Sequence, residues 1–157
     1  MTSYKHGKDF FNFRVAGVII KDGKVLFQRA TSDDFWALPG GRVEMLETTS
    51  QTLVREMEEE IGVKVEIKRL LFVVENFFDW ENTKAHELGF YYLITVPHNS
   101  KLMQTEEPFN SIDNETQLAF NWLSIDKLVE LPIYPVFLRK ALKDLPTCIM
   151  HVINKEE

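Results

Sequence analysis

One amphipathic helix stands out in a chain whose other segments mostly resemble strands. From about Thr49 to Ile61, apolar residues recur with the period of an α-helix. On a helical wheel they occupy one arc of about 100°, which is wide enough to pack on a sheet. Thr48 or Thr49 suits the N-cap of this helix, and Gly62 suits its C-cap. The apolar arc consists of Leu53, Val54, Met57 and Ile61.

Segments rich in aromatic and β-branched residues lie on both sides of this helix and predict a sheet. The first two are joined by Asp22-Gly23, a typical hairpin turn. A chain of 157 residues with this pattern predicts a single domain, residues 1–157, of the α/β class with a mixed sheet. The expected strands are Phe13–Ile20, Lys24–Arg29, Val63–Glu75 (one or two strands), Leu88–Val96 and Gln117–Leu123.

The segments between and after these strands predict one long loop and two further helices. Pro97–Asn114 is polar, contains a proline, and is expected to be a long loop. Ser124 is suited to cap a short helix at Ile125–Leu131, and another helix is expected to begin near Pro135.

Charge and cysteine content limit the classes of partner. The net charge of −6 argues against binding a nucleic-acid polymer, which requires a basic surface. No apolar run is long enough to span a membrane, and no signal peptide is recognised. Cys148 is the only cysteine, so we expect a cytoplasmic protein with Cys148 as a small buried residue. An anionic substrate would need bound cations or a local basic patch.

Three carboxylates lie beside the apolar arc of the helix. Glu56, Glu59 and Glu60 share a neighbouring arc, whereas Glu58 points elsewhere, toward solvent. Like charges four residues apart destabilise a helix, and the helix dipole disfavours anions near the C-terminus. A bound hard cation such as Mg²⁺ would remove both penalties. Taken alone, however, a run of glutamates is more often an ordinary solvated helix face.

The residues before and after the glutamates favour the metal-site interpretation. Five residues separate Gly41 from Glu47, and seven separate Glu47 from the run Arg55-Glu56-Met57-Glu58-Glu59-Glu60-Ile61-Gly62-Val63. This spacing resembles the Nudix box at every specified position. The preceding Leu38-Pro39-Gly40-Gly41 is also typical of that family.

The resemblance implies a fold, a reaction and a set of site residues. The fold would be the Nudix-type α/β/α sandwich with a mixed β-sheet. Family members hydrolyse a phosphoanhydride bond with Mg²⁺ or Mn²⁺, and they act on nucleoside diphosphates linked to another group. The substrate could be a nucleoside triphosphate, a nucleotide sugar or a dinucleotide. By motif position, the metal ligands would be Glu56, Glu59, Glu60 and the Gly41 carbonyl.

Other roles also follow from the resemblance. Glu47 and Arg55 would brace the loop against the helix, Gly62 would be structural, and the catalytic set would be Glu59, Glu56 and Arg55. The general base stays open between Glu59 and three acids outside the box, Glu106, Glu107 and Glu115.

Basic and aromatic residues are candidates to bind the rest of the substrate. Arg29 and Arg42 are the arginines nearest in sequence to the glycine loop and suit phosphate. Aromatic faces stack on any nucleobase. Trp36 and Trp80 are the preferred candidates, with Phe35, Phe77, Phe78 and Tyr91 as further ones.

Two alternative functions and the state of assembly remain open at this point. A Nudix fold can act as a nucleotide sensor without turnover, although the intact glutamate set argues against this. An isomerase acting on an isoprenoid diphosphate would need a reactive cysteine, and Cys148 lies in an apolar setting near the C-terminus. A homodimer is also compatible with the sequence.

Overall fold

A mixed sheet forms the centre of the protein, whose computed structural model describes residues 2–113 and 117–156. Strands β2 and β7 pair in parallel, and so do β6 and β10. Strands β1 and β5 both pair antiparallel with β2, and β6 pairs antiparallel with β7. The strand order is β1-β2-β7-β6-β10, with β5 paired to β2. The strands are β1 (Ser3–His6), β2 (Asp9–Val18), β5 (Gly40–Arg42), β6 (Glu66–Trp80), β7 (Thr83–Thr95) and β10 (Met150–Lys155).

A smaller antiparallel sheet continues the structure beyond β2. Its strand order is β3-β4-β9-β8. The expected turn at Asp22-Gly23 joins the first two of these strands, and both turn residues have positive φ. The strands are β3 (Ile20–Lys21), β4 (Lys24–Ala30), β8 (Phe109–Asn110) and β9 (Leu118–Ser124).

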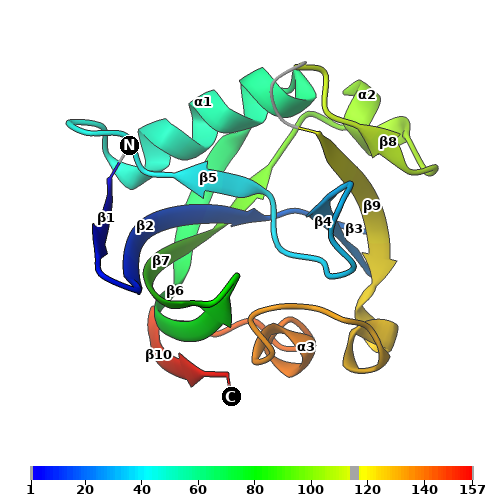
Figure 1. Cartoon of the computed structure of the whole chain (residues 1–157). Coiled ribbons are helices and arrows are strands. Elements are labelled where there is room, and N and C mark those ends of the chain that lie inside the picture. Colours follow the sequence, from blue (N-terminus) through cyan, green and yellow to red (C-terminus); the bar gives the residue numbers. More distant parts are fainter. Residues whose placement is uncertain (1, 114–116, 157) are drawn as a thin grey trace.

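Helical elements lie on both sides of the sheets (Figure 1), as expected for an α/β/α sandwich. Helix α1 (Thr49–Ile61) covers one side, with the predicted bounds. Thr48 is its N-cap, and Gly62 ends it in the left-handed conformation that favours glycine. The 3₁₀ helix η1 (Ile125–Glu130) and α3 (Leu138–Ala141) lie on the other side, and α2 (Lys101–Gln104) precedes β8.

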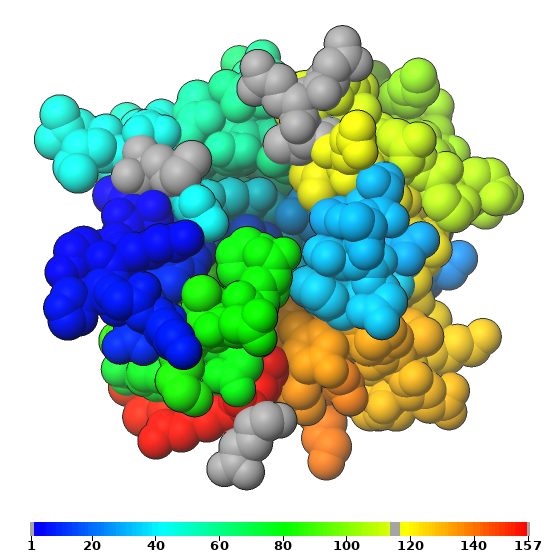
Figure 2. All heavy atoms as spheres, in the orientation of Figure 1, coloured from blue at the N-terminus to red at the C-terminus, as the bar shows by residue number. Residues whose placement is uncertain are grey.

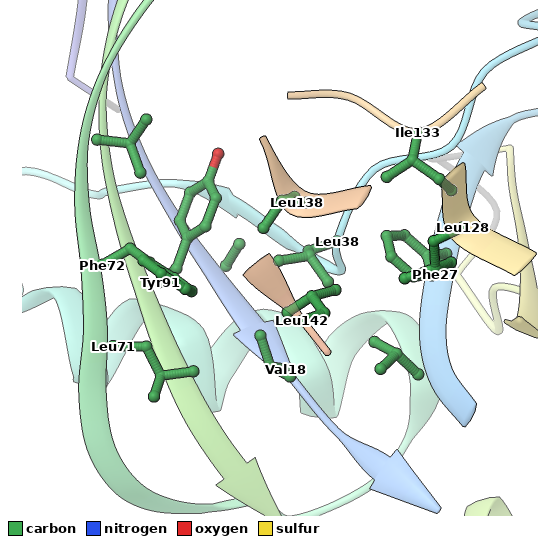
Figure 3. Packing of buried hydrophobic residues seen from close by; sticks show 13 residues of the cluster. Val18, Phe27, Leu38, Leu71, Phe72, Tyr91, Leu128, Ile133, Leu138 and Leu142 are labelled. Carbon is green, nitrogen blue, oxygen red and sulfur yellow. The ribbon is translucent and has the colours of Figure 1, made fainter. Parts of the chain in front are cut away.

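Two hydrophobic cores separate the layers. Leu53 and Met57 of α1 pack with Val15 and Ile19 on one side of the sheet. On the other side, Leu138 and Leu142 pack with residues of β2, β6 and β7, as Figure 3 shows. Because successive side chains of a strand point to opposite faces, Val15 and Ala16 enter different cores.

Several expectations outside the sandwich need correction. The segment 97–114 is not one loop, because it contains α2 and β8, which are too short to show periodicity. Ser124 precedes η1, but its side chain makes no capping hydrogen bond. Cys148 is exposed rather than buried, because it lies just before β10, an edge strand that the sequence did not predict. Among the residues that the structure describes, no helix has the length and apolar character needed to cross a bilayer.

Candidate active site

Strand β5 and helix α1 bring a glycine backbone against a carboxylate. Gly41 pairs with Val15 of β2, on the side of the sheet that α1 covers. A Cβ atom added to Gly41 would lie 2.8 Å from Cδ of Glu56 and 3.0 Å from its Oε1. The Glu56 carboxylate therefore rests directly on the Gly41 backbone, so two of the expected metal-site residues are adjacent.

Glu60 is a buried carboxyl group one helical turn after Glu56. Only 4% of its surface is exposed, and its Oε2 has no hydrogen-bond partner. Burial is the main reason that the pKa of Glu60 rises to about 8, and the hydrogen bond and charge of Glu56 raise it further. The positive charge of Arg14 acts in the opposite direction. Such a group either keeps its proton or requires a cation beside it.

Arg55 links the loop before α1 to the carboxylates of the helix. Its Nη2 lies 2.9 Å from Oε1 of Glu47, and its Nε donates to both oxygens of that carboxylate. Its Nη1 lies 3.4 Å from Glu56 and 3.2 Å from Glu59. The hydrogen bond from Arg55 is the main reason that the pKa of Glu47 is lowered. This contact fits the expected bracing of the loop against the helix.

The third expected metal ligand is oriented differently. The Glu59 side chain is 54% exposed and faces Arg55, and Glu58 is exposed on the outer surface of α1. Within residues 2–113 and 117–156, no three His, Cys, Asp or Glu side chains converge into a group that could hold a metal. The oxygens of Glu56 and Glu60 and the Gly41 carbonyl suit Mg²⁺, which completes its shell with water and phosphate. The full ligand set stays a prediction.

A cleft of about 650 Å³ opens beside β5. Figure 2 shows the surface hollowed between the turn that joins β6 to β7 and the segments near residues 33 and 134. Arg14 and Arg42, which are cross-strand partners on β2 and β5, line the cleft. The lining does not include Gly41, Glu56, Glu59 or Glu60. Arg14 is held in place by donating to the Leu38 carbonyl, 2.7 Å away. The two arginines give the cleft a local basic surface, and an acidic protein needs such a surface or bound cations if its substrate is anionic.

The structure places the expected substrate-binding residues unevenly around this cleft. Arg29, Arg42 and Trp80 line it, as do Phe35, Phe78 and Tyr91. Trp36 does not line the cleft but packs against the core. The Arg29 guanidinium lies over the Trp36 ring, with its Cζ atom 5.1 Å from the ring centre. Phe77 also lies outside the cleft lining and stacks on His86.

Two of the three acids proposed as alternative general bases lie outside the cleft lining. Glu106 and Glu107 are exposed in the segment between α2 and β8 and do not line the cleft. Glu115 lies outside the described residues. Glu59 does not line the cleft either, but it is connected to Glu56 because Arg55 contacts both carboxylates.

Sequence reasoning missed several polar residues of the cleft. Asn12 and Arg14 of β2, Gln28 of β4 and Glu87 of β7 all line it. The available signal was the occurrence of polar residues at alternate positions of strand-like segments, where one face is expected to be apolar. Asn12 was missed because the strand was predicted to begin at Phe13, whereas β2 begins at Asp9.

Comparisons with known proteins identify the family. The model of the NUDIX domain matches residues 12–145. An ADP-ribose pyrophosphatase of Methanocaldococcus jannaschii is 31% identical over 72% of this chain and 69% of its own length. A MutT-like protein of Streptomyces ambofaciens is 41% identical over 40% of this chain, a match that spans only 41% of that relative.

A solved structure supports the fold independently. The crystal structure of an ADP-ribose pyrophosphatase from Streptococcus suis has a TM-score of 0.60 and covers 91% of this chain and 98% of its own. Its sequence identity of 16% bears on the fold alone. The names of the sequence relatives indicate a hydrolase acting on pyrophosphate bonds. The domain match, the curated relatives and the carboxylate-bearing helix after Gly41 agree, and the chain belongs to the Nudix family.

Proposed function

We propose that the protein is a divalent-metal-dependent pyrophosphohydrolase that cleaves a phosphoanhydride bond in a nucleoside diphosphate joined to another group. The observation that carries this proposal is the pair of carboxyl groups of Glu56, which rests on the Gly41 backbone, and Glu60, one helical turn later. Glu60 is buried with an unpaired oxygen, and Glu56 is pressed against Gly41. Such an arrangement is costly without a cation and suits one with oxygen ligands.

In this proposal, the residues around the pair have different roles in hydrolysis. Arg14 and Arg42, which line the cleft, would bind phosphate oxygens, and Arg55, which contacts both Glu47 and Glu56, would fix the second relative to the first. Glu59 is exposed enough to accept a proton from an attacking water. Mg²⁺ or Mn²⁺ held by Glu56, Glu60 and the Gly41 carbonyl would neutralise charge on the diphosphate and lower the pKa of bound water. The nucleobase of the substrate would lie toward the aromatic residues of the cleft.

The test is a screen for hydrolysis with products identified by mass. Nucleoside triphosphates, nucleotide sugars and dinucleotides are incubated with Mg²⁺, Mn²⁺ or a chelator. We expect turnover with metal and none with the chelator. Glu56→Gln and Glu60→Gln should weaken metal affinity, whereas Glu59→Gln should lower kcat about a hundredfold or more with little change in metal affinity.

Glu58→Gln is the matched control, because Glu58 is on the same helix but faces solvent. It should keep the parent rate. The proposal is wrong if Glu56→Gln and Glu60→Gln proteins hydrolyse a substrate as fast as the Glu58→Gln protein. Tight nucleotide binding with no turnover under either metal would instead favour the sensor alternative.

A further inference from the structure

A row of polar side chains crosses the floor of the cleft. Asn12 of β2, Glu87 of β7 and Asn76 of β6 occupy matching positions on neighbouring strands. All three line the cleft, although strands in such positions usually carry apolar residues. Asn154 of β10 extends the row, since it pairs with Asn76 and donates a 2.9 Å hydrogen bond to its Oδ1.

The row is buried, and one of its acceptors is unpaired. Asn12 is 7% exposed, Glu87 7% and Asn76 5%. Asn12 donates through Nδ2 to Oε2 of Glu87 over 2.7 Å, which fixes the orientation of its amide. Its Oδ1 therefore remains an acceptor, and this atom is buried without a partner. A buried acceptor without a partner is costly, so it calls for a hydrogen-bond donor from a ligand.

A second acceptor lines the cleft from the other sheet. Gln28 of β4 is 8% exposed, lines the same cleft, and has a buried Oε1 without a partner. The carboxylate of Glu87 adds further acceptor capacity beside Asn12. This part of the cleft is therefore richer in acceptors than a site for an anion would be.

The neighbours of the row define the shape of the ligand. Arg14, the candidate to bind phosphate, lies on one side of the row. It is two residues from Asn12 along β2, which corresponds to about 7 Å in a strand. On the other side lie Phe10 and Trp80, whose ring centres are 6.4 Å apart. Trp80 is 42% exposed. A flat ring that extends from a phosphate bound at Arg14 would meet both the polar row and the aromatic rings.

We propose that Asn12 and Glu87 of this row recognise the amino group of a nucleobase and so select adenine or cytosine over their oxo counterparts. The inference rests on the proposed function, because it locates the base of the same nucleotide. An exocyclic amino group donates hydrogen bonds to Asn12 and Glu87. A carbonyl oxygen at that position would instead face acceptors and leave them unpaired.

The test measures binding of nucleoside monophosphates, so that it does not depend on hydrolysis. Isothermal calorimetry compares AMP with IMP and CMP with UMP, since each pair differs by an amino or oxo group on the base. We expect the amino form to bind about tenfold or more tightly in each pair. Glu87→Gln replaces one acceptor oxygen by a donor and should lower this ratio toward one.

Glu75→Gln is the matched control. Glu75 precedes Asn76 in β6, so its side chain lies on the opposite face of the sheet, where it contacts His151. This variant should keep the parent ratio. Thermal unfolding of each variant checks that Glu87→Gln is folded, and Asn12→Ala provides a second change within the row.

Three outcomes would overturn the inference: equal binding of AMP and IMP by the parent, no binding of any of the four probes, or an equal loss for AMP and IMP in Glu87→Gln. The last outcome would mean that the row holds the shared ribose. Failure of the proposed function would give a different result. A protein that binds AMP more tightly than IMP but hydrolyses no substrate would support the base site and contradict the proposed hydrolase activity.

Discussion

Two adjacent glycines of β5 face different neighbours, so one is expected to affect the stability of the sheet and the other the position of a carboxylate. A Cβ atom on Gly40 would overlap the Val15 carbonyl oxygen and lie 2.7 Å from the Ala16 Cα, both of which belong to the backbone of β2. The three atoms nearest to a Cβ atom on Gly41 would all belong to the Glu56 side chain. Gly40 is thus required by the sheet, whereas Gly41 is required by the position of a carboxylate.

We therefore expect Gly40→Ala and Gly41→Ala to have different effects. Gly40→Ala should lower the free energy of unfolding by roughly 1–3 kcal/mol, because the backbone of β2 must shift. Gly41→Ala should leave stability closer to the parent but weaken Mn²⁺ affinity, because Glu56 must turn away. Urea denaturation and metal titration measure the two effects. Unchanged metal affinity in Gly41→Ala would show that the contact between Gly41 and Glu56 has no role in the site.

The buried Glu60 carboxyl makes the stability of the metal-free protein depend on pH. Its pKa is 4.5 in the unfolded chain and about 8 in the folded protein. Between these two pH values the folded protein therefore holds a proton that the unfolded chain has released. The stability from this group is complete below pH 4.5 and is lost as the pH rises toward 8. Glu60→Gln keeps a neutral group of the same shape at every pH.

In the presence of a chelator, the Glu60→Gln protein should therefore unfold several degrees higher than the parent above pH 8. The two melting temperatures should converge near pH 4.5. Thermal unfolding across this range measures the difference, with Glu58→Gln as the solvent-exposed control. A constant difference between parent and Glu60→Gln at all pH values would contradict the assignment of the titration to Glu60.

At the scale of elements, helix α1 was predictable because its signals are local. Its apolar residues repeat with one period, Thr48 and Gln51 form a reciprocal capping box, and Gly62 ends it with a φ of 77°. Together these fix both ends of the helix. The pairing of Glu47 with Arg55 followed from the resemblance to the Nudix box rather than from periodicity.

Other elements could not be predicted, because their stability comes from distant residues. Strand β10 has mostly exposed residues and pairs with β6, whose residues lie more than seventy positions earlier. The polar row of the cleft has the same origin, since Asn12 and Glu87 meet only through the register of β2 and β7. Trp36 was expected at the substrate, but an aromatic side chain in a loop carries no local sign of which surface it will cover.

At the scale of the whole molecule, the two hydrophobic cores differ in how they are related to the carboxylates of α1. Leu53 is fully buried between α1 and the sheet, in the core that supports the helix bearing Glu56 and Glu60. Leu142 is 2% exposed in the opposite core, beneath η1 and α3. Because one sheet separates these cores, stability depends on both of them, whereas the position of the carboxylates depends mainly on the first.

We expect Leu53→Ala and Leu142→Ala each to lower the free energy of unfolding by about 2–5 kcal/mol, because each leaves a cavity in a packed core. Only Leu53→Ala should also weaken Mn²⁺ binding by the folded protein, since it loosens α1 over Gly41. Urea denaturation gives the stabilities, and metal titration well below the melting temperature gives the affinities. If Leu142→Ala weakened Mn²⁺ binding as much as Leu53→Ala, the packing of α1 on the sheet would not be what positions the carboxylates.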